Sequence, residues 1–375
     1  MKGAHAPSRR LARVALAALT AAVAAPCAGC PLPVPPRPPP AVRMVVTERW
    51  AGGGRLVVVD DAGDRQAVLV DHDPDQAGPV RDEQAAFSPD GRWIAFVSTR
   101  GQDLDHTRLL VVAARPGAMP LVLTGPGFSV QSPTWAPDGG LVFASDRAGS
   151  YDLYRLELDA RGRPRQAPVR LTAARSHELA PTIAADGRIA AQVIEPGLAP
   201  RSYLALVGPG GALTPLTDGP LDATPSWAPD GRRLAYATVR LGDDGREDEE
   251  LMILDTGRDR RPAAVTDLPT TDESGPVWSR DGRWLFATSV VLADDRSPRW
   301  SSVIVVDVRE PRFTPRMLRD RVGAIIRAGP ALAPVHLDEL ALGRAPPYLP
   351  ALAQALRELD EEPSARDHSD PPPPK

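Results

Sequence analysis

A phrase of seven residues returns five times in this chain, and every copy ends in Asp-Gly. Each copy begins with proline or alanine, and its third residue is large and apolar. The copies are Ala85–Gly91, Pro133–Gly139, Pro181–Gly187, Pro225–Gly231 and Pro276–Gly282. Their Asp-Gly pairs are 48, 48, 44 and 51 residues apart. Repeats of this period that are built from short strands are typical of a radial array of four-stranded blades, so the sequence predicts a β-propeller.

Each repeat contains four candidate strands. Asp-Gly between two apolar runs favours a tight primed hairpin turn, because both residues tolerate positive φ. Second strands follow each turn, as in Trp93–Val97. Third strands are predicted at Arg108–Ala113, Asp152–Leu158, Tyr203–Val207, Glu250–Leu254 and Ser302–Val306. Fourth strands are predicted around Leu123-Thr124, Leu171-Thr172, Leu216-Thr217 and Val265-Thr266. The aromatic residue before each turn is expected to fill the space between neighbouring blades.

The two ends of the repeat region predict a sixth blade. Arg55–Asp60 and Gln66–Asp71 resemble a third and a fourth strand, while Gly329–Pro334 and Glu339–Leu342 resemble a first and a second strand. Joining these halves closes the ring and leaves no long strand edge exposed. The prediction is therefore an all-β, six-bladed propeller over residues 46–343, closed by strands from both termini.

The repeats resemble those of the TolB-type six-bladed propeller family. The resemblance rests on the phrase Pro225–Tyr236, on Ser145-Asp146-Arg147 and on Tyr151–Tyr154, and it covers about four fifths of the chain. It implies the architecture more strongly than a function, because one fold hosts many functions. TolB carries an α/β domain ahead of its propeller, whereas few residues precede residue 46 here. The role of TolB in its envelope complex is therefore not expected to transfer whole.

Residues 1–29 are typical of a targeting segment, with a basic start and the apolar run Leu11–Ala25. Cys27-Ala28-Gly29-Cys30 resembles a bacterial lipobox, which implies lipidation of Cys30, although Cys27 stands where leucine is usual. Ordinary signal cleavage nearby is the alternative. Both cysteines of the chain lie in this motif. The mature protein is therefore expected to have no disulfide, thiol catalyst or cysteine metal site.

The remaining segments predict a tether and a tail. Residues 30–45 are proline-rich and favour a lipidated, semi-rigid spacer. Residues 344–361 predict a short C-terminal helix that packs on the propeller, and residues 362–375 a disordered tail. The net charge is −4, and becomes −8 without the four basic residues of the targeting segment. This charge argues against nucleic acid and leaves the lipid anchor as the only membrane contact. A monomer is expected.

One position in the repeat concentrates charge. Three residues before the proline or alanine that opens each first strand, the chain has Asp82, Val130, Glu178, Asp222 and Glu273, with Arg327 in the sixth blade. Strand order places this position at the rim of a central channel. Four carboxylates there predict a binding face for a cation or for a basic segment of a partner. Alternatively, they accept backbone hydrogen bonds or pair with Arg100, Arg147 and Arg240, which follow second strands.

Other acidic and histidine-containing segments give weaker signals. Asp71–Asp75 resembles the start of a calcium loop but lacks the glycine and distal glutamate, so a solvated turn is favoured. Val239–Glu250 carries six acids in twelve residues, which favours a solvated hairpin. His177 beside Glu178 is the best candidate for a metal site, although a surface histidine is favoured. No G-x-S-x-G or H-E-x-x-H motif occurs.

These signals together predict a non-catalytic, protein-binding or scaffolding lipoprotein. It is expected to lie in the cell envelope, anchored to the outer membrane and facing the periplasm, with an envelope protein as partner. No cofactor is expected, a divalent cation at the channel mouth being the alternative. The alternative functions are a propeller enzyme of the lyase or hydrolase type and a glycan-binding module that uses the channel. The glycan-binding hypothesis is less favoured, because Trp135, Trp227 and Trp278 occupy core positions of the repeat and are expected to be buried.

Overall fold

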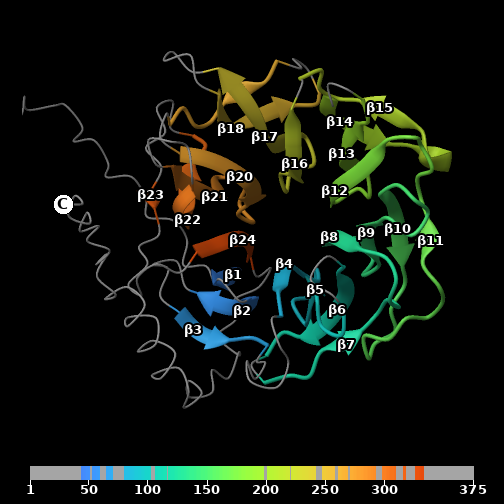
Figure 1. Cartoon of the computed structure of the whole chain (residues 1–375). Coiled ribbons are helices and arrows are strands. Elements are labelled where there is room, and N and C mark those ends of the chain that lie inside the picture. Colours follow the sequence, from blue (N-terminus) through green and yellow to red (C-terminus); the bar gives the residue numbers. More distant parts are fainter. Residues whose placement is uncertain are drawn as a thin grey trace, which may run out of the picture. The chain divides into compact units, whose positions relative to one another are not determined.

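The chain divides into two compact units, residues 1–38 and 39–375, and all residues described below belong to the second unit. The computed structural model describes residues 44–50, 53–59, 65–70, 80–102, 106–115, 117–197, 201–219, 221–241, 247–257, 261–268, 271–292, 298–309, 316–317 and 326–332. These residues form six four-stranded antiparallel sheets arranged around a central axis (Figure 1). The predicted all-β six-bladed propeller is confirmed.

Each sheet is one blade. We number as blade 1 the sheet β24-β1-β2-β3, and blades 2 to 6 follow in chain order. The inner strands are β24 (Ile326–Leu332), β4 (Asp82–Phe87), β8 (Val130–Trp135), β12 (His177–Ile183), β16 (Asp222–Trp227) and β20 (Thr271–Trp278). The second strands are β1 (Met44–Trp50), β5 (Trp93–Ser98), β9 (Leu141–Ser145), β13 (Ile189–Glu195), β17 (Arg233–Leu241) and β21 (Trp284–Leu292).

The outermost strand of each blade is the shortest, whereas the third strands vary in length from five to ten residues. The third strands are β2 (Gly53–Val59), β6 (Arg108–Ala113), β10 (Asp152–Leu156), β14 (Arg201–Val207), β18 (Glu247–Asp255) and β22 (Pro298–Asp307). The outermost strands are β3 (Arg65–Val68), β7 (Leu121–Val122), β11 (Val169–Arg170), β15 (Leu213–Pro215), β19 (Ala263–Ala264) and β23 (Arg316–Met317). A 3-10 turn at Pro209–Gly211 is the one helical element in the described part of the chain. Among the described residues, no helix is long and apolar enough to cross a membrane.

Blade 1 closes the ring with three strands from the N-terminal side and one from the C-terminal side. β1 pairs with β2 and also with β24, where Met44 lies opposite Leu332. The prediction of closure by both ends is confirmed, but the predicted two-plus-two division is wrong. Residues 44–50 form a local hairpin with β2, which leaves one strand position to fill. The predicted strand Glu339–Leu342 and the predicted helix at 344–361 lie outside the described residues.

The Asp-Gly turns differ in type from the predicted primed turn. Glycine has positive φ in all five, for example 69° at Gly91, but the preceding aspartate does not. The Gly91 N–H donates to the Ser88 carbonyl three residues earlier, and Asp90 accepts the Arg92 N–H. Pro89 fixes φ near −65°, which suits the second position of a type I turn. The result is a wider hairpin closed by a left-handed glycine.

The Leu-Thr pairs, which were predicted to lie in the fourth strands, come directly after the outermost strands in all four blades. Their threonine hydroxyls accept N–H groups of the third strand, with distances of 2.8 to 3.0 Å. The bonded pairs are Leu109 with Thr124, Leu153 with Thr172, Leu204 with Thr217 and Leu251 with Thr266. A side chain therefore continues the hydrogen bonding of each blade where backbone pairing stops.

Every inner strand of blades 2 to 6 contains the same bulge. It lies two residues after the position that holds Asp82, Val130, Glu178, Asp222 or Glu273. The bulged residues are Gln84, Ser132, Ala180, Thr224 and Gly275, with φ between 44° and 61°. Pairing with the second strand shifts register at this point in each of these blades. Left-handed backbone is costly for non-glycine residues, so the repeated bulge reflects the geometry that the ring requires of its inner strands.

The predicted aromatic contacts between blades are confirmed. Trp278 packs in a buried cluster with Leu251 of blade 5 and Leu285 of blade 6. Trp227 packs likewise with Leu204 of blade 4 and Leu234 of blade 5. Large flat side chains thus carry much of the apolar burial that holds neighbouring blades together.

Candidate functional site

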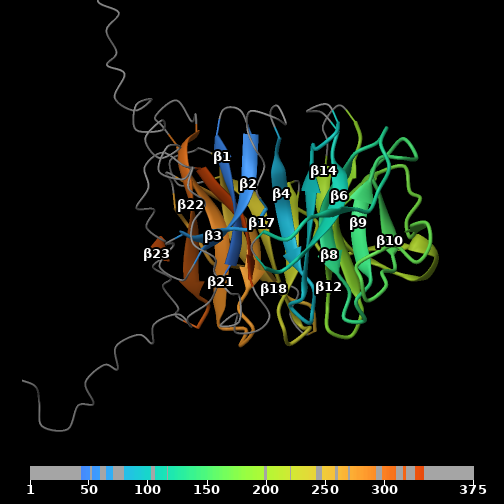
Figure 2. The same cartoon turned by 90° about the horizontal axis from the view of Figure 1, so that it is seen from below.

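The predicted charged position lies at the start of every inner strand. Inner strands of neighbouring blades contact one another in order around the axis (Figures 1 and 2). Asp82 and Asp222 are the first residues of β4 and β16, whereas Glu178 and Glu273 are the second and third residues of β12 and β20. Arg327 is the second residue of β24, opposite Glu48 of β1 in the register. The structure therefore brings these positions to one face of the propeller.

The four carboxylates are not open to solvent. Asp82, Glu178 and Glu273 are fully buried, and Asp222 is 3% exposed. Each accepts a hydrogen bond from a hydroxyl at 2.5 to 2.8 Å. The donor is Ser98 for Asp82, Ser176 for Glu178, Thr238 for Asp222 and Ser289 for Glu273. Burial raises the pKa of Glu178 and of Glu273, the latter to about 7. The bonds to Asp82, Asp222 and Glu273 join the inner strand to the second strand of the same blade, whereas Ser176 lies two residues before Glu178. Among the four carboxylates, only Asp222 lines a described pocket.

The predicted arginine partners behave differently in each blade. In blade 2, Arg100 forms a two-pronged ion pair with Asp82, at 2.6 Å to Oδ2 and 3.2 Å to Oδ1. In blade 3, where Val130 replaces the carboxylate, Arg147 lies over the rings of Phe128 and Tyr154. In blade 5, no ion pair or hydrogen bond to a described residue holds Arg240. Of these three arginines, only Arg100 pairs with one of the four carboxylates in the described part of the chain.

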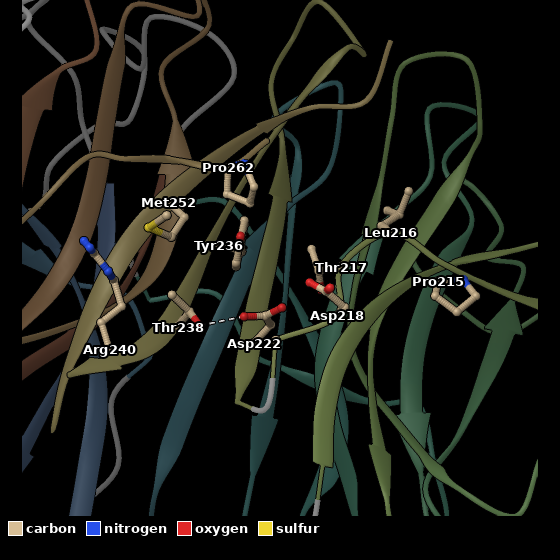
Figure 3. Close-up of a pocket in the computed structure, with 11 residues that line it drawn as sticks. Pro215, Leu216, Thr217, Asp218, Asp222, Tyr236, Thr238, Arg240, Met252 and Pro262 are labelled. Carbon is tan, nitrogen blue, oxygen red and sulfur yellow. Dashed lines mark hydrogen bonds between the residues drawn. The ribbon is translucent and has the colours of Figure 1, made fainter. Parts of the chain in front are cut away.

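A pocket of about 500 Å³ lies beside Asp222 (Figure 3). One wall is the segment that leaves the outermost strand of blade 4, and the other comes from β16, β17 and β18 of blade 5. The lining residues are Pro215, Leu216, Thr217, Asp218, Gly219, Asp222, Tyr236, Thr238, Arg240, Met252 and Pro262. The pocket therefore combines two carboxylates, a phenol and an arginine with a partly apolar wall.

Strand length explains why Arg240 does not close over Asp222. In blade 2 the second strand ends at Ser98, and Arg100 lies in the following turn, which returns it to Asp82. In blade 5, β17 continues to Leu241, so Arg240 stays in the ladder opposite Asp248. Figure 3 shows its side chain directed away from Asp222. The longer hairpin therefore leaves the carboxylate without its arginine.

The electrostatic character of the pocket is negative near Asp222. Thr238 donates to Oδ1 of Asp222 at 2.6 Å, and no described residue donates to Oδ2. Burial, together with the charges of Asp222 and Asp218, raises the pKa of Tyr236 above its ordinary value. The Tyr236 hydroxyl has no hydrogen-bond partner among the described residues, although the side chain is only 2% exposed. A cation entering the pocket would therefore meet a carboxylate oxygen and a phenol oxygen without partners.

The acidic run Val239–Glu250 forms more than a solvated loop. Its last residues belong to β18, where Asp248 and Glu250 are buried. Glu250 accepts the Leu268 N–H at 2.7 Å, and burial raises its pKa. Burial and the nearby Asp272 raise the pKa of Glu249 to about 7. The correction arises because the strand extends further than predicted and carries these acids into the boundary between blades 5 and 6.

His177 lies in a contact between blades. Its Nδ1 accepts the Tyr151 N–H at 3.2 Å, and the two rings are tilted at 6.1 Å. In the described part of the chain, no three His, Cys, Asp or Glu side chains are grouped so as to hold a metal ion. The calcium-like segment Asp71–Asp75 and the proposed lipidation site Cys30 lie outside the described residues.

A second pocket, of about 350 Å³, lies on the opposite face between blades 2 and 3. Trp93 and Trp135 line it together with Pro89, Pro137 and charged residues of the Asp-Gly turns. Trp227 and Trp278 are buried as predicted, but Trp135 is only partly buried. Arginines cover the two buried tryptophans, whereas Trp93 occupies the position of Arg233 in blade 2. The sequence feature that indicates this pocket is the tryptophan at position 93, where blade 5 has an arginine.

Comparison with known proteins agrees with this architecture. The family model described as the TolB beta propeller domain matches residues 82–280. No curated protein matches the sequence. Among solved structures, TolB from Acinetobacter baumannii is 19% identical with a TM-score of 0.57, covering 78% of this chain and 67% of that one.

Two further solved structures share this fold. Putative TolB from Agrobacterium tumefaciens is 16% identical with a TM-score of 0.51, covering 79% of this chain and 99% of that one. Hydrazine synthase from Kuenenia stuttgartiensis is 13% identical with a TM-score of 0.60, covering 78% of this chain and 47% of that one. This chain thus spans about half the length of the synthase chain. Identities this low show the shared fold alone.

Proposed function

Because the chain belongs to the TolB β-propeller domain family, we propose that it is a non-catalytic binding module of the bacterial cell envelope. In this proposal a lipid on Cys30 anchors it to the outer membrane, and the propeller faces the periplasm as a monomer. It captures an envelope protein on the face where the inner strands begin. No cofactor takes part.

The observation that carries this proposal is the pocket beside Asp222 and the hairpins on the same face. The strands of the β17–β18 hairpin have nine residues each, whereas those of β5 and β6 have six. At the end of β17, Leu241 is 72% exposed. An exposed apolar side chain beside an acidic pocket combines the two features that protein interfaces use most, an apolar anchor and charge complementarity.

Burial changes which substitutions can test the binding face. Reversing the charge of Glu273 or Asp222 would bury an unpaired lysine and unfold the protein. The test therefore uses the exposed residues Asp218 and Leu241, as Asp218→Lys and Leu241→Ser. Met119→Ser is the matched control, because Met119 is 85% exposed and lies on the opposite face, between β6 and β7.

The experiment is in-cell crosslinking of the tagged protein, with captured proteins identified by mass spectrometry. We expect one discrete envelope protein, captured by the wild type and Met119→Ser but lost from Asp218→Lys and Leu241→Ser. Equal capture by all variants would exclude this face. A Cys30→Ser variant should release the protein from the membrane fraction, and retention there would overturn the lipid anchor.

A glycan-binding function is the second candidate, and the pocket between Trp93 and Trp135 favours it. Partly exposed indole rings beside carboxylates suit the apolar faces and hydroxyls of a sugar. Calorimetry with peptidoglycan fragments tests this candidate. Binding that is lost in Trp93→Ala would establish it, and the absence of heat at millimolar fragment would dismiss it.

A further inference from the structure

We infer that the pocket beside Asp222 binds the guanidinium group of an arginine supplied by the protein partner. This inference rests on the proposed binding function and names the side chain that the partner inserts. It goes beyond a general acidic face, because it specifies one pocket, one chemical group and the residues that hold it.

Blade 2 contains the same receptor with an arginine already in place. Asp82, Ser98 and Arg100 stand in the same spacing as Asp222, Thr238 and Arg240. In both blades the hydroxyl donates to Oδ1 of the carboxylate at 2.6 Å. In blade 2 the guanidinium then bonds both carboxylate oxygens. The fold therefore shows in blade 2 how an arginine sits on this receptor.

In blade 5 the receptor is present and the arginine is not. Asp222 is almost completely buried, yet its Oδ2 receives no hydrogen bond from a described residue. Asp222 lines the pocket, and a guanidinium that reached its Oδ2 would add a charge-assisted hydrogen bond there. A pocket of about 500 Å³ is open in front of it. This volume suits a long side chain entering from outside.

The rest of the lining fits arginine better than lysine. The hydroxyl of Tyr236 has no partner among the described residues, and the exposed Asp218 adds a second carboxylate at the wall. A planar guanidinium can donate to more than one of these oxygens at once in a fixed geometry, which an ammonium does less well. The apolar wall at Leu216, Met252 and Pro262 can cover the methylene groups of the side chain.

The propeller already places arginine against aromatic rings elsewhere. Arg188 and Arg233 lie over Trp227 and Trp278, with 4.9 and 4.7 Å from guanidinium carbon to ring centroid. Arg147 lies 4.7 Å from the Tyr154 ring centroid. Arginine is thus stacked on an aromatic ring at two boundaries between blades and once within blade 3.

Two residues determine how readily the pocket accepts a guanidinium group, one through space and the other through charge. A Cβ added at Gly219 would lie 2.4 to 2.7 Å from the carboxylate atoms of Asp222, so Gly219 leaves room that any larger residue would take. Arg240 stands at the other side with the same charge as the expected guest. It repels that guest, so its removal should strengthen binding.

The first experiment is calorimetry on the purified full-length protein with N-acetyl-arginine amide. N-acetyl-citrulline amide is the matched control, since it has nearly the same shape and no charge. We expect a millimolar dissociation constant for the arginine derivative, about tenfold weaker binding of the lysine derivative, and no binding of citrulline. Equal binding of arginine and citrulline derivatives, or binding of neither, would overturn the inference.

Variants then locate the site. Asp222→Asn should weaken arginine-amide binding at least tenfold, Gly219→Ala at least fivefold, and Arg240→Gln should strengthen it about threefold. Asp159→Asn removes a partly exposed charge on the opposite face and should not change binding. A folding defect cannot produce opposite signs at Asp222 and Arg240, and unfolding temperatures check each variant. No change in Asp222→Asn and Gly219→Ala would place the arginine elsewhere and overturn the inference.

The partner is tested separately from the pocket. If the wild type captures a partner, replacing single arginines of that partner should abolish capture at one position. Capture that survives every such replacement, while arginine amide still binds, would overturn the inference and leave the proposed binding function standing. Failure to capture any partner would instead count against the proposed function.

Discussion

The guanidinium carbon of Arg233 lies 4.7 Å from the ring centroid of Trp278, across the boundary between blades 5 and 6. The same side chain donates to the Gly282 carbonyl at 3.0 Å, so it joins the turn of the next blade. Arg188 does the same for Trp227 and Gly231 one blade earlier. Between blades 2 and 3 the corresponding residue is Trp93, and a pocket opens there instead.

Arg233→Ala should lower the free energy of unfolding by about 1 to 2 kcal/mol, because it removes a stacked cation and a hydrogen bond. Arg233→Lys keeps the charge but not the planar stacking, and should cost about half as much. Urea unfolding followed by tryptophan fluorescence measures both. A neutral result for Arg233→Ala would mean that this contact contributes nothing to holding the blades together.

Glu273 should make stability depend on pH. Burial, together with nearby Glu250 and Asp272, raises its pKa from an ordinary 4.5 to about 7. The folded state therefore binds more protons than the unfolded state between these pH values, so the free energy of unfolding falls as pH rises from about 4.5 to 7. The loss attributable to this group is about 3 kcal/mol. It is complete above pH 7.

Glu273→Gln should remove that contribution, because the amide oxygen can still accept from Ser289 and carries no charge. We expect the variant to be more stable than the wild type at pH 8 and nearly equal at pH 4.5, as measured by urea unfolding at both values. Asp82→Asn is the contrast. It deprives Arg100 of its ion pair and should destabilise at both pH values. A Glu273→Gln variant that is less stable at pH 8 would contradict the argument.

Gly275→Ala tests the bulge of the inner strands. A Cβ at Gly275 would touch nothing within 4 Å, so the expected cost of about 1 to 2 kcal/mol comes from the backbone alone, at φ +61°. Ala180→Gly relieves the same strain in blade 4 and should gain up to about 1 kcal/mol, since glycine also loses more entropy on folding. Thermal unfolding measures the stability of both variants. Stability changes of the same sign would contradict backbone strain at the bulge.

Thr124→Val tests the hydroxyl that continues the pairing of blade 2. It leaves the buried Leu109 N–H without an acceptor and should cost about 1 to 3 kcal/mol. Thr124→Ser keeps the hydroxyl and should cost less. Amide exchange of Leu109, followed by NMR, should accelerate in the valine variant only.

The repeat phrase was sufficient to predict the blades, since Asp-Gly turns and apolar runs are local signals. It was not sufficient for details that depend on neighbours. The turn type followed from Pro89 and was misjudged, and the closing blade took three N-terminal strands because residues 44–50 form a hairpin with β2. The role of the Leu-Thr pairs was missed, because a hydrogen bond from Leu109 to Thr124 joins residues fifteen positions apart.

The sequence by itself determined the number of blades, the positions of the inner strands and the gathering of Asp82, Glu178, Asp222 and Glu273 on one face, because periodicity dictates register. Only the tertiary structure decided that these carboxylates are buried. It also decided that Arg100 closes over Asp82 while Arg240 leaves Asp222 beside a pocket. The spacing of the three residues is the same in both blades, and the difference is how far the second strand continues. That length depends on cross-strand pairing with β18, an interaction between segments that no local pattern reports.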